Sequence, residues 1–365
     1  QRDLNYEYPF GSRLFGSICI KVSGITAFDM SYTLPFALLI ITILLYYSYS
    51  HVLLKFKELA ILSVLFLLSM PNVSTTILEF TAAVFAVPFI VSIMYLTINK
   101  EIFFIKRLAL AALFMFLLSF SHAGTYLFLF SFFLVYMFIY SVLWRNFEKD
   151  SYLLWVITLA TYIVTIHLFG HIHAHYIDKC RFILVIGEFL SSIFHVDFIA
   201  DLSQIVYNCI FVDVDLTHTA MLCGFVYALL RGITLLSSKI SILRHHVSVP
   251  IISNIKHIPH SITFTPIWLG PIHTFLMLFG ITKLRNMKQC ASILSTLIIV
   301  GLLPGALHKG STGALKEIWY FLIIVPIVST LGFLWIVTTM RRYAKKYWVA
   351  KTILYIICLL YTSDA

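Results

Sequence analysis

The sequence predicts an all-α fold, namely a polytopic bundle of transmembrane helices with about 10–12 spans. The first observation is composition: 60% of the 365 residues are hydrophobic and 12% are charged, whereas charged residues make up about a quarter of a typical soluble protein. The second is that apolar runs reach the roughly 20 residues needed to cross a ~30 Å hydrocarbon core. The third is that cationic loops alternate with uncharged ones. We therefore expect a multi-pass integral protein of the cytoplasmic membrane.

Apolar runs recur along the chain and define the expected spans. They cover residues 30–47, 59–70, 77–96, 108–120, 125–144, 152–169, 262–279, 291–307 and 318–338. The pattern weakens within residues 170–260, where an outer loop and re-entrant or interfacial helices both fit the sequence. We expect one multi-pass domain over residues 29–365, with the chain continuing before Gln1 and after Ala365.

The charged residues predict which side each loop faces. Three cationic loops carry Lys55 and Lys57, then Lys100, Lys106 and Arg107, then Arg145 and Lys149, and the turns between them, residues 71–76 and 121–124, carry no charge. The positive-inside rule places the cationic loops in the cytoplasm, so the turns and residues 1–28 face outward. Because the net charge of +10 is spread over loops and not along one face, nucleic acid is not an expected partner.

Residues 1–28 form a distinct N-terminal region on the outer side. Pro9 has a fixed φ angle and biases Tyr8 toward an extended backbone, while Gly11 permits a close turn. Apolar side chains then recur at helical spacing within residues 14–25, which predicts a short helix on the membrane surface. A carboxylate, a guanidinium and two phenols of residues 6–13 are therefore expected just outside the bilayer.

Several ionisable residues fall on the expected outer side. Glu79 lies less than a turn inside the third span, and an ionisable residue at membrane depth suggests function, although one so close to the surface also reaches water. His171, His173 and His175 have the imidazole chemistry to hold a divalent metal ion. Histidines at a membrane interface are common, and that alternative is favoured because only Asp178 and Cys180 offer a further metal ligand nearby.

Three further outward residues carry or can carry positive charge, namely Arg13, His122 and Lys316. Near the outer headgroup layer they could hold an anionic phosphate by charge-assisted hydrogen bonds. The alternative is that these long side chains only extend their charge to the water interface.

Three motifs resemble those of GT-C-fold membrane glycosyltransferases of archaeal and bacterial type. Residues 8–15, Tyr-Pro-Phe-Gly-Ser-Arg-Leu-Phe, resemble the Tyr-Pro-Pro-Gly-Phe-His motif of the first outer loop. Residues 121–125, Ser-His-Ala-Gly-Thr, are similar to a Ser/Thr-His-Pro-x-Thr turn. Residues 315–326 are similar to an Arg-containing re-entry into a helix with a central proline. Phe10 and Arg13 depart from the first motif, and Ala123 and Gly124 replace the proline position of the second.

The resemblance implies an enzyme, of inverting type, that transfers a sugar from a polyprenyl-phosphate donor to a glycan, lipid or protein acceptor outside the membrane. It makes residues 1–28 the end of the first outer loop. It implies a catalytic acid, either Glu7, Asp3 or a residue before Gln1, with Tyr8 beside it. Arg13, His122 and Lys316 would then bind the donor phosphate.

Two other functions fit the same composition. A transporter or flippase of lipid-linked sugars would carry ionisable residues along a central path at mid-membrane. The conspicuous ionisable residues here are instead expected on the outer side of the membrane. A polymerase similar to O-antigen ligases would use the same donor and a large arginine-rich outer loop. Residues 170–260 are long enough but offer only Arg181, Arg231 and Arg244.

Overall fold

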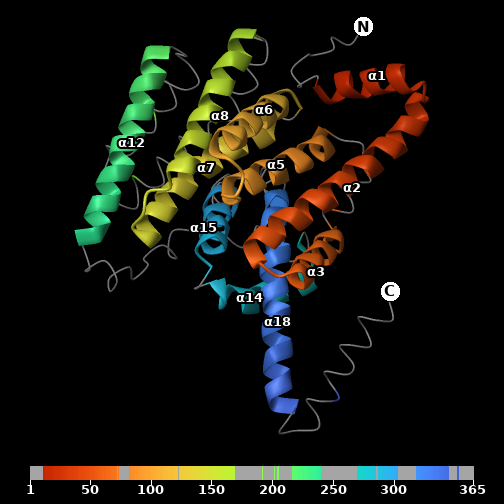
Figure 1. The fold of residues 1–365 in the computed structure, drawn as a ribbon, viewed down its shortest axis with the longest axis vertical. Coiled ribbons are helices and arrows are strands. Elements are labelled where there is room, and N and C mark those ends of the chain that lie inside the picture. The colour runs from red at the N-terminus through yellow and green to blue at the C-terminus, as the bar shows by residue number, and fades with distance from the viewer. Residues whose placement is uncertain are drawn as a thin grey trace.

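The computed structural model describes residues 11–71, 73, 82–121, 123–168, 191, 201, 204, 216–239, 269–284, 287–302, 318–344 and 352. Within this part of the chain the fold is all-α, as predicted, and no strand occurs (Figure 1). The helices are α1 (Gly11–Ser23), α2 (Ala27–Leu54), α3 (Lys57–Leu68), α5 (Ala82–Ile98), α6 (Phe104–Ser121), α7 (Ala123–Trp144), α8 (Lys149–Leu168), α12 (Leu216–Lys239), α14 (Pro271–Ile281), α15 (Lys288–Leu297), η6 (Ile298–Leu302), η7 (Ile318–Ile323) and α18 (Val325–Ala344).

Local signals in the sequence account for both ends of α2, the longest of these helices. Thr26 lies before its first residue in an extended conformation, and its hydroxyl oxygen accepts a hydrogen bond from the Asp29 backbone N–H at 3.1 Å. This contact satisfies one of the free N–H groups of the first turn. At the other end Lys55 adopts φ 63° and its N–H donates to the His51 carbonyl at 2.8 Å, which closes the helix and lets α3 turn back.

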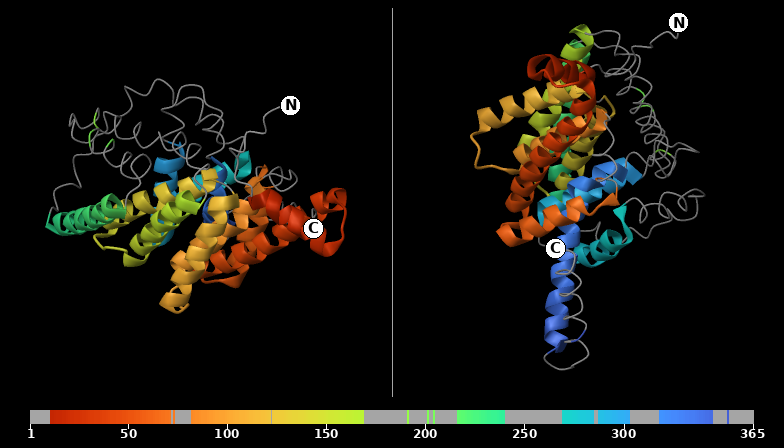
Figure 2. Two further views of the ribbon diagram at one scale, coloured as in Figure 1. Left: turned by 90° about the horizontal axis from the view of Figure 1, so that it is seen from above. Right: turned by 90° about the vertical axis from the view of Figure 1, so that its right-hand side faces the viewer.

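Helices α5 to α8 form an antiparallel group, because short connections join α5 to α6, α6 to α7 and α7 to α8. In Figure 1 this group lies between α12 on one side and α2 with α3 on the other, and Figure 2 shows the same order from two further directions. Because neighbouring helices are antiparallel, the connections after α5 and after α7 lie at one end of the group, and the α6–α7 turn lies at the other.

The core of this group is largely aromatic, and Tyr126, Phe132, Phe133 and Trp155 are fully buried in it.

Helices α14 and α18 cross at very close range. A Cβ atom added to Gly280 would lie 2.0 Å from the Val328 carbonyl oxygen, and one added to Gly332 would lie 1.9 Å from the Leu276 carbonyl oxygen. Only glycine allows two backbones to approach so closely. Such small-residue contacts are typical of helices that pack within a bilayer. The far end of α18, which carries Arg341 and Arg342, extends beyond the other helices (Figures 1 and 2).

One helix in the described part of the chain, α2, is long and apolar enough to cross a membrane. Five shorter apolar stretches accompany it, namely Ala86–Ile98, Phe128–Trp144, Ala220–Leu235, Pro271–Ile281 and Lys288–Val300. The side chains of Phe36, Ile40 and Leu44 on α2 are exposed, and large exposed apolar residues in such numbers indicate contact with lipid or with another apolar surface.

Candidate functional site

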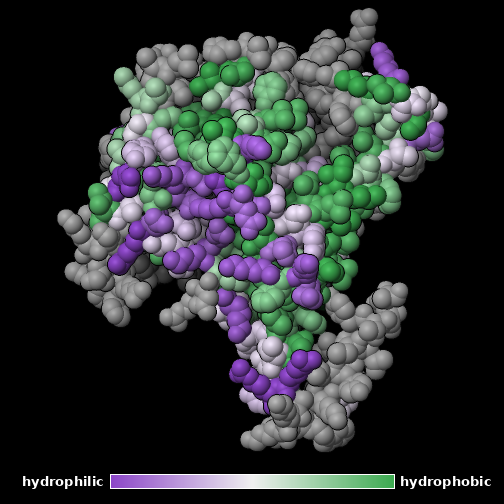
Figure 3. All heavy atoms as spheres, viewed as in Figure 1, coloured by the Kyte–Doolittle hydropathy of each residue, from purple (hydrophilic) through white to green (hydrophobic). Residues whose placement is uncertain are grey.

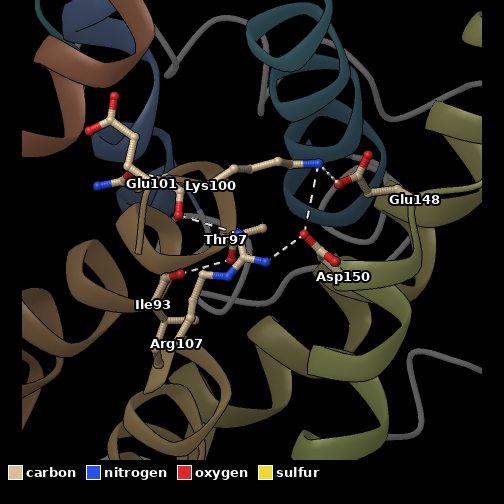
Figure 4. A network of polar contacts seen from close by, with 8 residues as sticks. Ile93, Thr97, Lys100, Glu101, Arg107, Glu148 and Asp150 are labelled. Carbon is tan, nitrogen blue, oxygen red and sulfur yellow. Dashed lines mark hydrogen bonds and ion pairs between the residues drawn. The ribbon is translucent and has the colours of Figure 1, made fainter. Parts of the chain in front are cut away.

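Four charged side chains form an ion-pair network at the end of the α5–α8 group where α5 meets α6 and α7 meets α8. Arg107 comes from the first turn of α6, and its Nη2 atom lies 2.7 Å from Asp150 Oδ2 in the first turn of α8. Lys100 Nζ lies 2.7 Å from Glu148 Oε1 and 3.8 Å from Asp150 Oδ2. Figure 4 shows the Arg107 guanidinium and the Lys100 ammonium group, both from the α5–α6 connection and the first turn of α6, converging on Asp150 at the start of α8.

The two cations of this network differ in burial. The Arg107 side chain is 6% exposed and the Lys100 side chain is 55% exposed. Arg107 also donates from Nη1 to the Asn99 carbonyl oxygen at 3.3 Å and lies over the Phe104 ring, 5.6 Å from its centroid. A buried guanidinium needs such partners, because an uncompensated buried charge is costly. The Arg107–Asp150 pair is therefore the part of the network that holds the two loops together.

The helix dipole of α8 and the pKa of Lys100 both favour the charged forms that this ion-pair network requires. Glu148 and Asp150 lie at the start of α8, where the positive end of the helix dipole favours carboxylates. Partial burial lowers the pKa of Lys100, but the hydrogen bond to Glu148 and the charges of Glu148 and Asp150 outweigh burial and raise that pKa above its ordinary value of 10.5. Lys100 is thus charged at neutral pH.

A second cationic connection, between α14 and α15, lies beside the α7–α8 connection. Trp144 at the end of α7 donates from Nε1 to Ser292 Oγ of α15 at 2.8 Å, and Lys288 Nζ lies 5.2 Å from the centroid of the Trp144 ring. Figure 3 shows hydrophilic side chains gathered in a band across this face of the molecule, with hydrophobic surface on both sides. The α7–α8 connection, which the sequence assigned to the cytoplasm, is thus in contact with the cationic α14–α15 connection.

The opposite end of the group holds a buried cluster of hydroxyl groups, which we call the hydroxyl junction and which consists of Ser119, Thr125, Thr165 and Tyr320. Ser119 Oγ of α6 lies 3.0 Å from Thr165 Oγ1 of α8. Thr125 Oγ1 of α7 lies 3.2 Å from the Tyr320 hydroxyl of η7. Arg107 and Ser119 are twelve residues apart on α6, which corresponds to about 18 Å along the helix axis.

A stripe of aromatic rings connects the two ends along α7. Phe128, Phe132, Tyr136 and Tyr140 recur every four residues, so they share one face of the helix, and successive ring centroids lie 5.8–5.9 Å apart. The stripe begins at Tyr320, whose ring is stacked on Phe128 with a centroid distance of 3.6 Å and an interplanar angle of 6°. The α6–α7 turn and η7 are therefore fixed to the same rigid helix.

His273 is a buried residue that the sequence analysis did not single out. Its Nε2 atom lies 3.0 Å from the Phe66 carbonyl oxygen and 3.1 Å from Ser69 Oγ, and its own carbonyl accepts from Ser329 Oγ at 3.2 Å. Since a carbonyl can only accept, Nε2 carries the ring hydrogen. The sequence did contain a signal for this residue, because His273 lies inside the predicted apolar run 262–279, where an ionisable side chain is unusual. It joins α3, α14 and α18.

Most residues that the sequence predicted for a site lie outside the described residues, namely Asp3, Glu7, Tyr8, Glu79, His122, His171, His173, His175 and Lys316. Arg13 lies in α1, and its side chain is likewise outside the described set. In the described part of the chain no group of three His, Cys, Asp or Glu residues could hold a metal ion. Glu148 and Asp150 were missed because only cations were compared between loops, although acidic residues that open a helix are a recognised signal.

Comparison with known protein families, with characterised proteins and with solved structures finds no match to this chain. The functional argument therefore depends on the chain's own residues.

Proposed function

We propose that this chain is a multi-pass membrane glycosyltransferase of GT-C type, which transfers a sugar from a polyprenyl-phosphate donor to an acceptor on the outer side of the cytoplasmic membrane. The donor-binding cations in this proposal are Arg13, His122 and Lys316, and the acid is Glu7 or Asp3. The alternatives from other classes, a transporter of lipid-linked sugars and an O-antigen-ligase-like polymerase, are outcomes of the experiments below.

The observation that carries the proposal is the contact between Thr125 and Tyr320. Thr125 follows His122 by three residues and Tyr320 follows Lys316 by four in the sequence. The 3.2 Å contact between their hydroxyl groups joins α7 to η7, which follow these two motifs and are almost 200 residues apart in the sequence. The proposal requires both cations to bind one phosphate leaving group, which charge-assisted hydrogen bonds would stabilise.

The arrangement of charge supports the same proposal. The ion-pair network and the Trp144–Lys288 contact occur at one end of the bundle, and the hydroxyl junction occurs at the other. A membrane between these ends would give the cytoplasmic and outer sides that the positive-inside rule requires. The close α14–α18 crossing through Gly280 and Gly332 also fits helices packed in lipid.

The proposed step is an inverting displacement at the anomeric carbon of the sugar. The acceptor oxygen forms a bond to this carbon while the bond from the carbon to the phosphate oxygen breaks. The acceptor proton passes to the Glu7 or Asp3 carboxylate, which acts as general base. The polyprenyl phosphate leaves with the electron pair, and the cations stabilise its developing negative charge.

A transporter is less well supported by the described residues. The buried charged residues among them are Arg107 and Glu148, and both belong to the ion-pair network at one end. The buried His273 is a further ionisable residue, but its Nε2 atom is held by the Phe66 carbonyl oxygen and Ser69 Oγ between helices. A translocation path would require ionisable groups near the middle of the bundle.

The test is transfer from a radiolabelled polyprenyl-phosphate sugar in proteoliposomes that contain the purified chain. We expect His122→Ala and Lys316→Gln each to lower kcat/KM by 10- to 100-fold, because each removes one charge-assisted contact to the leaving group. Glu7→Gln and Asp3→Asn identify the acid. Lys309→Gln is the matched control, since it removes an outer cation that has no role in the proposal.

Labelled sugar found inside sealed vesicles without any transferred product would contradict the proposal and favour the transporter. An equal loss of transfer in Lys309→Gln and Lys316→Gln would contradict the assignment of Lys316.

A further inference from the structure

We infer that the surface around Trp144, which consists of Trp144, Arg145, Lys149 and Lys288, binds the headgroup of an anionic phospholipid. This inference is independent of glycosyl transfer and requires only that the chain lie in a membrane. It follows from how the charges at this end of the bundle are paired.

The carboxylates of the α7–α8 connection are already engaged. Glu148 pairs with Lys100 and Asp150 pairs with Arg107. Within the described residues neither Arg145 nor Lys149, which flank the same connection, forms an ion pair, although both are exposed. The two carboxylates of this connection are therefore neutralised by Lys100 and Arg107, and its two exposed cations, Arg145 and Lys149, remain accessible to an anionic ligand at the surface.

Lys288 adds a third cation from a different part of the chain. It is exposed at the start of α15, and its Nζ atom lies 5.2 Å from the centroid of the Trp144 ring. The electron-rich face of the indole attracts the ammonium group and so favours this position of Lys288. The hydrogen bond from Trp144 Nε1 to Ser292 Oγ at 2.8 Å fixes the indole in turn.

The combination of a fixed, partly exposed indole and three cations matches one class of partner. Tryptophan prefers the headgroup level of a bilayer, where its apolar ring and polar N–H are both accommodated. Lysine and arginine side chains beside the membrane are attracted to anionic lipid headgroups, and their contributions add. Arg145, with φ 52°, directly follows Trp144, so the indole and a guanidinium are held on adjacent residues.

The experiment reconstitutes the full chain into nanodiscs of phosphatidylcholine with an increasing fraction of phosphatidylglycerol, and measures co-purified phosphatidylglycerol per protein by mass spectrometry. We expect enrichment over the bulk fraction, and we expect the triple variant Arg145→Gln, Lys149→Gln, Lys288→Gln to lower the preference by roughly 10- to 100-fold. The control variant Lys21→Gln, Arg341→Gln, Arg342→Gln removes the same charge elsewhere and should retain the preference.

Equal losses in the two triple variants would overturn the inference, because net charge alone would then explain binding. Absence of enrichment in the unmodified chain would also overturn it. A large excess of inorganic phosphate separates the two sources of the anion. Displacement of the lipid by phosphate would show a site for free phosphate and would overturn the assignment to a lipid headgroup. Trp144→Phe removes the indole N–H, which donates to Ser292 Oγ, and keeps an aromatic ring, so it should weaken the preference less than the triple variant.

Discussion

Asp150 and Glu148 belong to one ion-pair network, yet their partners give them different energetic weights. Asp150 pairs with the buried Arg107, whereas Glu148 pairs with Lys100, which is more than half exposed. Removing Asp150 leaves the buried Arg107 guanidinium without compensation, whereas removing the buried Glu148 carboxylate leaves only the exposed Lys100 ammonium, which water screens. The network is therefore held mainly by Arg107 and Asp150.

We expect Asp150→Asn to lower the free energy of unfolding by about 3 kcal/mol, because it leaves the Arg107 guanidinium buried beside a neutral amide. The matched substitution Glu148→Gln should cost less than about 1 kcal/mol. Both values can be measured by denaturant titration in detergent micelles, followed by circular dichroism. Equal losses in the two variants would show that burial does not decide the strength of these pairs.

The pKa of Lys100 predicts a change at alkaline pH. Because the folded state raises this pKa above 10.5, the stabilisation from the Lys100 ammonium is fully present below pH 10.5 and is lost as the pH rises through the folded-state pKa. The difference in stability between the unmodified chain and Lys100→Met should therefore shrink above pH 10.5. Unfolding midpoints between pH 8 and pH 12 test this, and a difference that is constant over that range would contradict it.

At the scale of the elements, the α14–α18 crossing depends on two glycines. A Cβ atom at Gly280 or Gly332 would meet the backbone of the other helix at 2.0 Å or 1.9 Å, so the helices would have to separate. We expect Gly280→Ala and Gly332→Ala each to lower the free energy of unfolding by about 2 kcal/mol, measured by the same denaturant titration.

Gly224 and Gly232 of α12 provide the control for this prediction. A Cβ atom at either position would meet no atom within 4 Å, so Gly224→Ala and Gly232→Ala should be neutral or should stabilise by up to about 1 kcal/mol through helix propensity. A similar loss at all four glycines would indicate that close packing between α14 and α18 is not the cause.

The sequence predicted several elements well because their boundaries carry local signals. The runs 108–120, 125–144 and 152–169 correspond to α6, α7 and α8. The run 318–338 was expected to be continuous, but it divides into η7 and α18. Pro326, at the second position of α18, lacks an N–H group and interferes with the carbonyl four residues earlier, so a helix begins there more readily than it continues.

Other features could not be predicted because they depend on contacts between distant residues. The hydropathy pattern weakens within residues 170–260, where residues 221–236 are apolar only in part, yet α12 covers Leu216–Lys239. Arg231 lies over the Phe147 and Tyr227 rings at 5.3 Å and 5.7 Å, and Tyr152 donates to the Cys223 carbonyl at 2.9 Å. A sequence pattern shows the hydropathy of a helix but not the aromatic surface against which it packs.

The site was predictable to a smaller extent than the fold. Charge alternation identified Lys100 and Arg107 as part of one cationic loop, but it gave no indication that Asp150 lies 2.7 Å from Arg107. It also treated the α14–α15 connection separately from the α7–α8 connection, which the Lys288–Trp144 contact joins. Both pairings are set by helix packing, which no local motif encodes.

At the scale of the whole molecule, the two ends of the bundle differ in chemistry. One end carries the ion-pair network and exposed cations, and the other carries the hydroxyl junction, while the aromatic stripe of α7 joins them. The proposed function requires a membrane between these ends. In the proposed function, the outer site would be positioned by the packing of α7 and not by loop contacts alone.

The most direct test of this account is the side of the membrane on which each end lies. Single cysteines would be introduced as His122→Cys and Asn146→Cys in a chain whose six native cysteines are replaced by serine, and intact cells would be treated with a membrane-impermeant maleimide. We predict labelling of His122→Cys in intact cells and labelling of Asn146→Cys only after the membrane is opened. Labelling of both positions from the same side would contradict the account.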